Sequence, residues 1–318
     1  MDIGQANEVA GRLLGELGKA IVGQQQVLAE MVASFLAGGH ALLEGVPGTG
    51  KTLMVRALAA VSGSGFRRIQ FTPDLMPSDI LGVNIYNTAT GEFVFRPGPV
   101  FADVILGDEI NRAPAKTQSA LLEAMQERQV TIDGVTHPVS EAFSVFATQN
   151  PVEFEGTYPL PEAQVDRFLV KIRVPYPAED QEGGILDRAH AGFDAADLGT
   201  ADLQTVLDPQ GLAELRRTVR SVRVEEMVRR YITRVVRTTR EIREVSLGAS
   251  PRAAVMLLRV AQAWAVLAGR EFVTPDDVKA MAPPALRHRI SLLPEVEIEG
   301  HDADDCIGRL LAQIPVPR

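Results

Sequence analysis

The chain has 318 residues, which is enough for two domains that each bury a core of their own. Apolar residues make up 46% of it and charged residues 23%, the balance of a globular protein in water. The formal net charge of −9 argues against a chain built mainly to coat nucleic acid or an anionic membrane. The single cysteine, Cys306, excludes an internal disulfide framework and a cysteine-rich metal site.

The N-terminal sequence Met-Asp-Ile-Gly-Gln does not show the basic-then-apolar pattern of a secretory signal. No uninterrupted apolar run approaches the roughly 20 residues that span a bilayer. The five histidines form no ligand cluster with one another or with the cysteine, so no transition-metal site is expected. We therefore expect a soluble, cytoplasmic protein that does not insert into a membrane.

The most informative segment is a glycine-rich stretch between the short apolar run 41–43 and a helical pattern over 52–58. It matches the phosphate-binding pattern G-x-x-x-x-G-K-T, and the candidate nucleotide-binding residues are Gly45, Val46, Pro47, Gly48, Thr49, Gly50, Lys51, Thr52 and the adjacent Leu53. Strand, loop and helix in this order are the context that the motif requires. The glycines let backbone N–H groups converge on phosphates, Lys51 can reach the β- and γ-phosphates, and the Thr52 hydroxyl suits Mg²⁺. The sequence therefore predicts a nucleoside triphosphate site.

A second apolar run, 104–107, ends in the acidic pair Asp108 and Glu109. Two carboxylates at the end of a buried strand are costly unless an ion or a substrate satisfies them. Asp108 suits an Mg²⁺ shell, and Glu109 suits a base that orients or activates the attacking water. The alternative is that the pair only caps the next helix. The phosphate loop about 60 residues upstream makes this alternative less favoured.

Apolar runs alternate with helical patterns through the first half, which implies a parallel sheet flanked by helices. The candidate strands are 68–71, 104–107, 143–148 and 169–174, and an Asp-Gly step predicts a tight hairpin at 129–134. At the tip of one strand, Asn150 can hydrogen-bond the attacking water or the γ-phosphate, although an isolated Asn before a proline is simply a turn residue. Arg167 can act as a permanently charged donor to a phosphate oxygen. The alternative interpretation is that it is a surface arginine paired with Asp166 or Glu162.

Prolines at 175 and 177 mark a boundary after the last strand, and apolar residues then recur at helical spacing. We expect a core over residues 1–175 and a smaller, all-helical domain over 176–318. Arg252 follows Ser250-Pro251 at the start of a helix. Taken alone, it is equally a first-turn arginine in solvent.

These motifs together resemble the MoxR family of AAA+ ATPases over almost the whole chain. Besides the phosphate loop, the resemblance is carried by D-E-I-N-R at 108–112, A-T-Q-N-P at 147–151 and P-E-A-Q-x-D-R-F at 161–168. It implies an α/β fold in which a P-loop αβα core with a parallel sheet is followed by a C-terminal helical lid. One departure is Gly107, where the family usually has an apolar side chain, and it suggests tighter backbone packing.

The resemblance also assigns roles to the site residues. It places Lys51 and Thr52 in Walker A, Asp108 and Glu109 in Walker B, Asn150 at sensor 1, Arg167 as the arginine finger toward a neighbouring subunit, Arg252 as sensor 2 toward the γ-phosphate of its own subunit, and Val22 and Gly23 in the stretch that lines the adenine pocket. Residues 72–99 correspond to the helix-2 insert and 129–138 to the pre-sensor-1 hairpin, which face the pore of a ring. The alternative for both is a tolerated surface excursion.

The implied activity is hydrolysis of ATP with Mg²⁺ in a homo-oligomeric ring, as a hexamer, by a chaperone-like remodeller or maturation factor of a client protein complex. The implied partner carries a von Willebrand factor A domain. One alternative is a nucleic-acid remodelling motor, since residues 214–243 contain ten arginines, although a basic stripe without interleaved aromatics is more typical of a solvated helix face. Another is a nucleotide-gated assembly scaffold, against which Glu109 argues because a pure binder does not need this carboxylate. No N-K-x-D stretch indicates a GTPase.

Overall fold

The computed structural model describes residues 1–151 and 157–317. Its centre is a five-stranded sheet in which every neighbouring pair is parallel. In spatial order the strands are β2 (Phe66–Gln70), β5 (Val104–Asp108), β8 (Ser144–Gln149), β1 (Ala41–Glu44) and β9 (Val170–Arg173). Each strand predicted from the sequence is present, with ends shifted by at most two residues. The predicted α/β class is confirmed.

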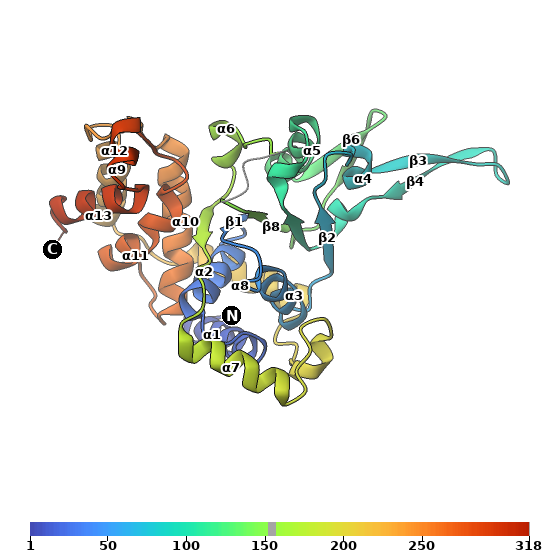
Figure 1. The fold of residues 1–318 in the computed structure, drawn as a ribbon, viewed down its shortest axis with the longest axis horizontal. Coiled ribbons are helices and arrows are strands. Elements are labelled where there is room, and N and C mark those ends of the chain that lie inside the picture. The colour runs from blue at the N-terminus through green and yellow to red at the C-terminus, as the bar shows by residue number, and fades with distance from the viewer. Residues whose placement is uncertain (152–156, 318) are drawn as a thin grey trace.

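Helices cover both faces of this sheet (Figure 1). One layer contains α1 (Ile3–Ala20), α2 (Gln25–Leu36), α3 (Lys51–Val61) and α8 (Pro209–Ser221), and the other contains α5 (Ala115–Glu127) with the short α6 (Glu162–Val165). Alternate residues of each strand enter two different cores, because successive side chains of a strand point to opposite faces. Leu43 and Leu106 pack with α1–α3, whereas Leu42 and Ile105 pack with Leu121 of α5. Strands buried on both faces explain the uninterrupted apolar runs in the sequence.

Two hairpins project from the core. The first follows α4 (Pro77–Leu81) and pairs β3 (Gly82–Asn87) with β4 (Glu92–Pro97), and the second pairs β6 (Gln129–Ile132) with β7 (Val135–Pro138). In Figure 1 the β3–β4 hairpin extends away from the rest of the molecule, on the side opposite the C-terminal helices. Asp133 and Gly134 have φ of 49° and 82°, so the Asp-Gly step forms the predicted turn with two left-handed residues.

The C-terminal region is helical, as predicted. It contains α9 (Glu226–Thr238), α10 (Pro251–Leu267), α11 (Pro275–Leu286), α12 (Pro294–Ile298) and α13 (Ala303–Gln313). The predicted apolar face of α9 is buried through Ile232, Val235 and Val236. A two-stranded antiparallel sheet of β10 (Val245–Leu247) and β11 (Ser291–Leu292) accompanies the helices, and these strands are too short to produce an alternating pattern in the sequence.

The segment between the core and the C-terminal helices packs back on the core. It contains α7 (Glu179–His190), the turn Leu198–Ala201 and α8. Arg56 of α3 donates to the carbonyls of Ala195 (3.2 Å) and Ala196 (2.9 Å), and α8 contacts α1, α2 and α10. The N-terminal helix α1 contacts α3, α8 and α10, so it joins the sheet layer to the lid. The division at residue 175 stays a prediction.

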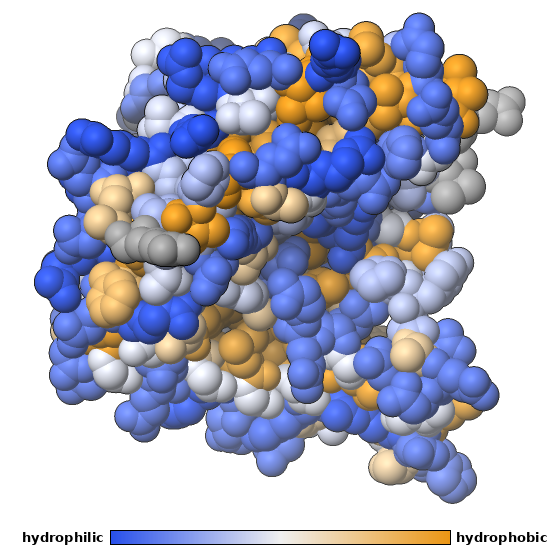
Figure 2. All heavy atoms as spheres, turned by 90° about the vertical axis from the view of Figure 1, so that its left-hand side faces the viewer, coloured by the Kyte–Doolittle hydropathy of each residue, from blue (hydrophilic) through white to orange (hydrophobic). Residues whose placement is uncertain are grey.

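The outer side of the C-terminal helices faces the viewer in Figure 2. Hydrophilic residues dominate this face, and apolar residues gather in smaller groups between them. Within residues 1–151 and 157–317, no helix combines the length and the apolar character needed to cross a bilayer.

Candidate active site

A cavity of about 390 Å³ opens at the carboxyl ends of β1, β5 and β8. This is the edge of an open parallel sheet at which ligands bind. Predicted site residues from three segments meet in its lining. Lys51 and Thr52 come from the loop after β1 and the start of α3, Asp108 and Glu109 from the end of β5, and Asn150 from the end of β8. Pro47, Gly48, Thr49, Gly50 and Leu53 line it as well. The sequence prediction that these scattered motifs form one site is therefore consistent with the geometry.

The loop needs glycine for two different reasons. Gly48 and Gly50 have φ of 82° and 81°, in the left-handed region, and a Cβ added to either would meet nothing within 4 Å. Gly45 instead lies so close to β9 that an added Cβ would stand 2.4 Å from the backbone oxygen of Val174. Helix α3 starts at Lys51 without a side-chain cap, which leaves its first N–H groups to an anion.

Lys51 is held against the loop. Its Nζ donates to the carbonyls of Gly45 and Val46, both at 2.7 Å, and to the Thr49 hydroxyl at 3.4 Å. Burial lowers the pKa of Lys51, while the carboxylates of Asp108 and Glu109 oppose that shift. Because its bonded partners are neutral oxygens, a phosphate oxygen offers this ammonium a stronger acceptor.

Asp108 is oriented by two neighbours from adjacent strands. Its carboxylate accepts from the Thr148 hydroxyl at 2.6 Å and from Arg68 at 2.7 and 3.1 Å. Sequence analysis missed Arg68 and Thr148. The available signal was their position as polar residues close to the carboxyl ends of β2 and β8, beside the end of β5.

Glu109 has a strained backbone, with φ 56° and ψ 51°. A non-glycine residue in the left-handed region costs of order 1–3 kcal/mol, and such residues cluster at functional sites. Its N–H donates to the Thr148 hydroxyl (2.8 Å), and its Oε2 accepts from Gln70 (2.9 Å) and pairs with Arg112 (3.3 Å). Gln70 is a further residue that sequence analysis missed. The strained turn directs this carboxylate into the cavity lining.

The donor set fits a hard cation. Thr52 and Asp108 both line the cavity, and hydroxyl and carboxylate oxygens are ligands that Mg²⁺ accepts. Among the described residues, no group of three His, Cys, Asp or Glu side chains converges on a metal-sized site. Two protein oxygens suit an ion that takes its remaining ligands from water and from the substrate's phosphates.

Val22 and Gly23 lie next to α7, outside the residues that line this cavity. A Cβ on Gly23 would stand 2.3 Å from the Gln181 side chain, and a Cβ on Gly184 would stand 3.1 Å from Val22. Their assignment to an adenine pocket stays a prediction. Gly107, in β5, is closely packed as the sequence suggested, since an added Cβ would lie 3.3 Å from Phe71.

Arg167 and Arg252 line a different cavity, of about 440 Å³. Arg167 donates to the Leu122 carbonyl at 2.7 Å, and its buried Nε has no partner among the residues described. Arg252 lies 3.9 Å from Asp166. Arg252 therefore lines a cavity other than the phosphate-loop cavity, whereas the resemblance implied a position at the γ-phosphate of its own subunit. The reason is the docking of the lid, since Ser250, which precedes α10, donates to Asp166 (3.3 Å) and so lies beside the segment that carries Arg167.

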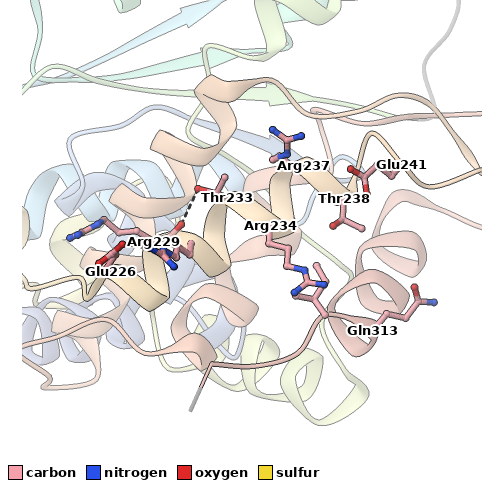
Figure 3. Close-up of a pocket in the computed structure, with 10 residues that line it drawn as sticks. Glu226, Arg229, Thr233, Arg234, Arg237, Thr238, Glu241 and Gln313 are labelled. Atoms are coloured by element: carbon pink, nitrogen blue, oxygen red, sulfur yellow. Dashed lines mark hydrogen bonds and ion pairs between the residues drawn. The ribbon is translucent and has the colours of Figure 1, made fainter.

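The ten arginines of residues 214–243 do not form a single stripe. Arg216 is buried and donates to the Phe35, Glu141 and Ala142 carbonyls and to the Ser144 hydroxyl. Four others from α9 line a groove of about 790 Å³, namely Arg229, Arg230, Arg234 and Arg237. Figure 3 shows Arg229, Arg234 and Arg237 along this helix. Glu226 and Glu241 also line this groove, and Glu226 pairs with Arg230 at 2.6 Å. These arginines are thus divided between a buried position and a groove that also carries two carboxylates.

Comparison with known proteins places these two regions in a family. Residues 40–170 match the family model described as "ATPase family associated with various cellular activities (AAA)", and residues 237–309 match the AAA lid domain. Chaperone MoxR1 of Mycobacterium tuberculosis is 43% identical over 318 residues, which cover 96% of this chain and 82% of that protein. The chain belongs to the MoxR family of AAA+ ATPases.

Two further proteins are similar to this chain over nearly its whole length. YeaC of Bacillus subtilis, whose name carries no function, is 46% identical to this MoxR-family chain over 310 residues, 96% of this chain and 94% of that one. A crystal structure from Cytophaga hutchinsonii, described provisionally as an ATPase, superposes with a TM-score of 0.90 at 42% identity and covers 99% of this chain and 96% of that one. The predicted AAA+ fold with a helical lid is therefore confirmed.

Proposed function

We propose that this AAA+ ATPase hydrolyses ATP with Mg²⁺ at the subunit interfaces of a homo-oligomeric ring, as a hexamer, and uses hydrolysis to remodel or mature a client protein complex. MoxR-family AAA+ ATPases typically form ring oligomers. The observation that carries the proposal is the separation of the site into two cavities. Lys51 and Glu109 line one of them, and Arg167 lines the other.

A single chain therefore holds an incomplete site. Charge on the transferred phosphoryl group needs donors on its exposed side, which an arginine finger supplies in many NTPases. Since Arg167 and Arg252 share a cavity away from the phosphate loop, we assign both to the nucleotide of the adjacent subunit. Sensor 2 thus acts between subunits in this proposal.

The loop residues bind and position the substrate. Lys51 exchanges its carbonyl acceptors for phosphate oxygens, and the first N–H groups of α3 donate to the same group. Thr52 and Asp108 would hold Mg²⁺, which supplies charge neutralisation on the β- and γ-phosphate oxygens. Glu109 gives up its contacts with Gln70 and Arg112 and accepts a hydrogen bond from the attacking water. Asn150 fixes the position of that water. The water oxygen bonds to the γ-phosphorus as the bond between that phosphorus and its bridging oxygen breaks. Glu109 takes the proton that the water loses, and the products are ADP and phosphate.

The two hairpins are the proposed working elements. Tyr86, Phe93 and Val94 are 52%, 71% and 50% exposed, so large apolar side chains gather on the projecting β3–β4 hairpin. The hairpins contact each other, because His137 of β7 stacks on Phe95 of β4 with ring centroids 4.2 Å apart. A shift at the end of β5 or β8 can thus move both hairpins against a client.

The chaperone-like role follows the name of the M. tuberculosis relative and the family resemblance. By that resemblance we propose a partner with a von Willebrand factor A domain, which binds the ring and presents the client.

The test of the proposed activity is ATP binding and steady-state hydrolysis with Mg²⁺ by the wild type, by Lys51→Ala and by Glu109→Gln. We expect Lys51→Ala to lose tight ATP binding and Glu109→Gln to bind ATP and hardly hydrolyse it.

Three outcomes would contradict the proposal. Turnover at the wild-type rate in Glu109→Gln would remove this carboxylate from the mechanism. A wild-type chain that binds ATP and assembles without turnover would support the scaffold alternative instead. Strong stimulation by DNA, falling as salt rises, would support the nucleic-acid motor.

A further inference from the structure

Four arginines from three elements line the cavity of about 440 Å³ that contains Arg167. Arg128 follows α5, Arg167 precedes β9, and Arg252 and Arg259 lie on α10. The proposed mechanism uses only Arg167 and Arg252. Arg128 and Arg259 thus add two positive charges to a cavity that already holds two.

Carboxylates do not balance this charge. In the part of the chain that the structure describes, the one acidic partner of the four arginines is Asp166, 3.9 Å from Arg252, and Asp166 also accepts from Arg289 at 2.7 Å. Arg128 donates to the backbone carbonyls of Phe143 (2.6 Å) and Gly38 (2.7 Å). A cavity with this excess of guanidinium groups is complementary to an anion that carries several charges.

The pKa of Arg128 reflects the same crowding. Burial lowers the pKa of this guanidinium, and the charges of Arg220 and Arg259 lower it further. Arg259 is therefore close enough to repel Arg128, although one lies on the lid and the other on the core.

Arg259 points to the same side of α10 as Arg252. The two are seven residues apart, which is nearly two full turns and about 10.5 Å of rise at 1.5 Å per residue. Val255 and Met256 line the cavity between them, and neither side chain carries a charge that could pair with a guanidinium. Arg259 is exposed and has no hydrogen bond or ion pair within residues 1–151 and 157–317. Its guanidinium is free to bind a ligand that enters this cavity.

We propose that Arg259 is a third arginine that each subunit presents, beside Arg167 and Arg252, to the triphosphate held by the next subunit. The inference rests on the proposed function, since it needs ATP at a subunit interface. A triphosphate is the multivalent anion that the ring would bring to this cavity. The planar guanidinium can donate two parallel hydrogen bonds to phosphate oxygens, which a lysine ammonium cannot match.

The first test compares the steady-state kinetics of Arg259→Ala, Arg259→Lys and a matched control, Arg230→Ala. Arg230 is also an exposed arginine of the C-terminal helices, and it pairs with Glu226. Loss of a charged hydrogen bond in the transition state predicts a fall in kcat of roughly 10- to 100-fold for Arg259→Ala. ATP affinity should change little because the variant's own phosphate loop is intact. Arg259→Lys should retain part of the activity, and Arg230→Ala should match the wild type.

The second test shows whether Arg259 acts between subunits. Mixing Arg259→Ala with Lys51→Ala creates junctions at which an intact loop faces an intact Arg259, so activity should exceed the sum of the two separate preparations. A purely structural or same-subunit role predicts no such recovery, and that result would overturn the inference. Wild-type kcat in Arg259→Ala would overturn it as well, while the proposed function would stand. A wild-type chain without ATP hydrolysis would refute the proposed function and the inference with it.

Discussion

Arg289 connects the lid to the segment that carries Arg167, and we predict that its loss lowers both stability and hydrolysis. It follows α11, and its guanidinium is buried. It donates to the Asp166 carboxylate (2.7 Å), to the Asp166 carbonyl (3.0 Å) and to the Leu169 carbonyl (3.1 Å). It also donates to the carbonyls of Phe168 and Ala285. Arg289→Met removes all of these donors while nearly preserving side-chain volume.

The expected loss follows from burial. Removing one partner of a buried ion pair costs about 3–5 kcal/mol, because the other charge is left without compensation. Asp166 keeps 22% of its side chain exposed and retains Ser250 and Arg252 nearby, which places the loss near the lower end, about 3 kcal/mol. Burial lowers the pKa of Arg289 and Asp166 raises it, so the carboxylate offsets part of the desolvation of this guanidinium.

Urea unfolding, ATP binding and steady-state hydrolysis measure these effects in Arg289→Met and in a control, Arg309→Met. Arg309 is a half-exposed lid arginine 3.6 Å from Glu244, so its variant should stay within about 1 kcal/mol of the wild type. Arg289→Met should hydrolyse poorly because Arg167 loses its fixed position. It should still bind ATP, since residues 166–169 do not line the phosphate-loop cavity. Wild-type hydrolysis together with an unfolding free energy within about 1 kcal/mol of the wild type would refute this reasoning.

Two further predictions concern acid stability and the hairpins. Burial lowers the pKa of His40 to about 3, against about 6.5 when unfolded, so the folded state loses stability below pH 6.5, roughly 2 kcal/mol at pH 5. Urea unfolding at pH 8 and pH 5 should show this loss in the wild type and a smaller one in His40→Gln; equal losses would contradict it. Replacing residues 135–137 with Gly-Ser-Gly removes the stack on Phe95, and should weaken stimulation by a partner while leaving basal hydrolysis nearly intact. A collapse of basal hydrolysis together with ring assembly would make the hairpin a structural interface.

The sequence was sufficient to predict that the phosphate loop, the acidic pair and Asn150 lie around one cavity. Lys51 lies at the end of the glycine-rich loop, Asp108 is the last residue of β5, and Asn150 directly follows β8. The carboxyl ends of parallel strands meet at one edge of a sheet. The local sequence pattern was therefore enough to predict that these three residues lie close together. The polar residues that orient the acidic pair, Gln70 among them, carry no motif, and their contacts depend on the order of strands in space.

The arginine half was harder to predict. Whether Arg252 faces its own phosphate loop or the side of Arg167 is decided by how the lid docks, through Ser250 and Arg289 on Asp166. No local pattern encodes that contact. Arg259 had no sequence signal at all, because one arginine on an exposed helix face is ordinary until three others are seen in the same cavity.

The central claim is that each active site is shared by two subunits. It is tested most directly by mixing Lys51→Ala, which lacks a working phosphate loop, with Arg167→Ala, which lacks the finger. Each variant alone should hydrolyse ATP poorly, with a loss of roughly 10³-fold or more expected for Arg167→Ala. The mixture should recover activity at junctions that pair an intact loop with an intact finger. Full activity of the wild type as a dilute monomer, or a mixture no more active than its two components, would contradict the account.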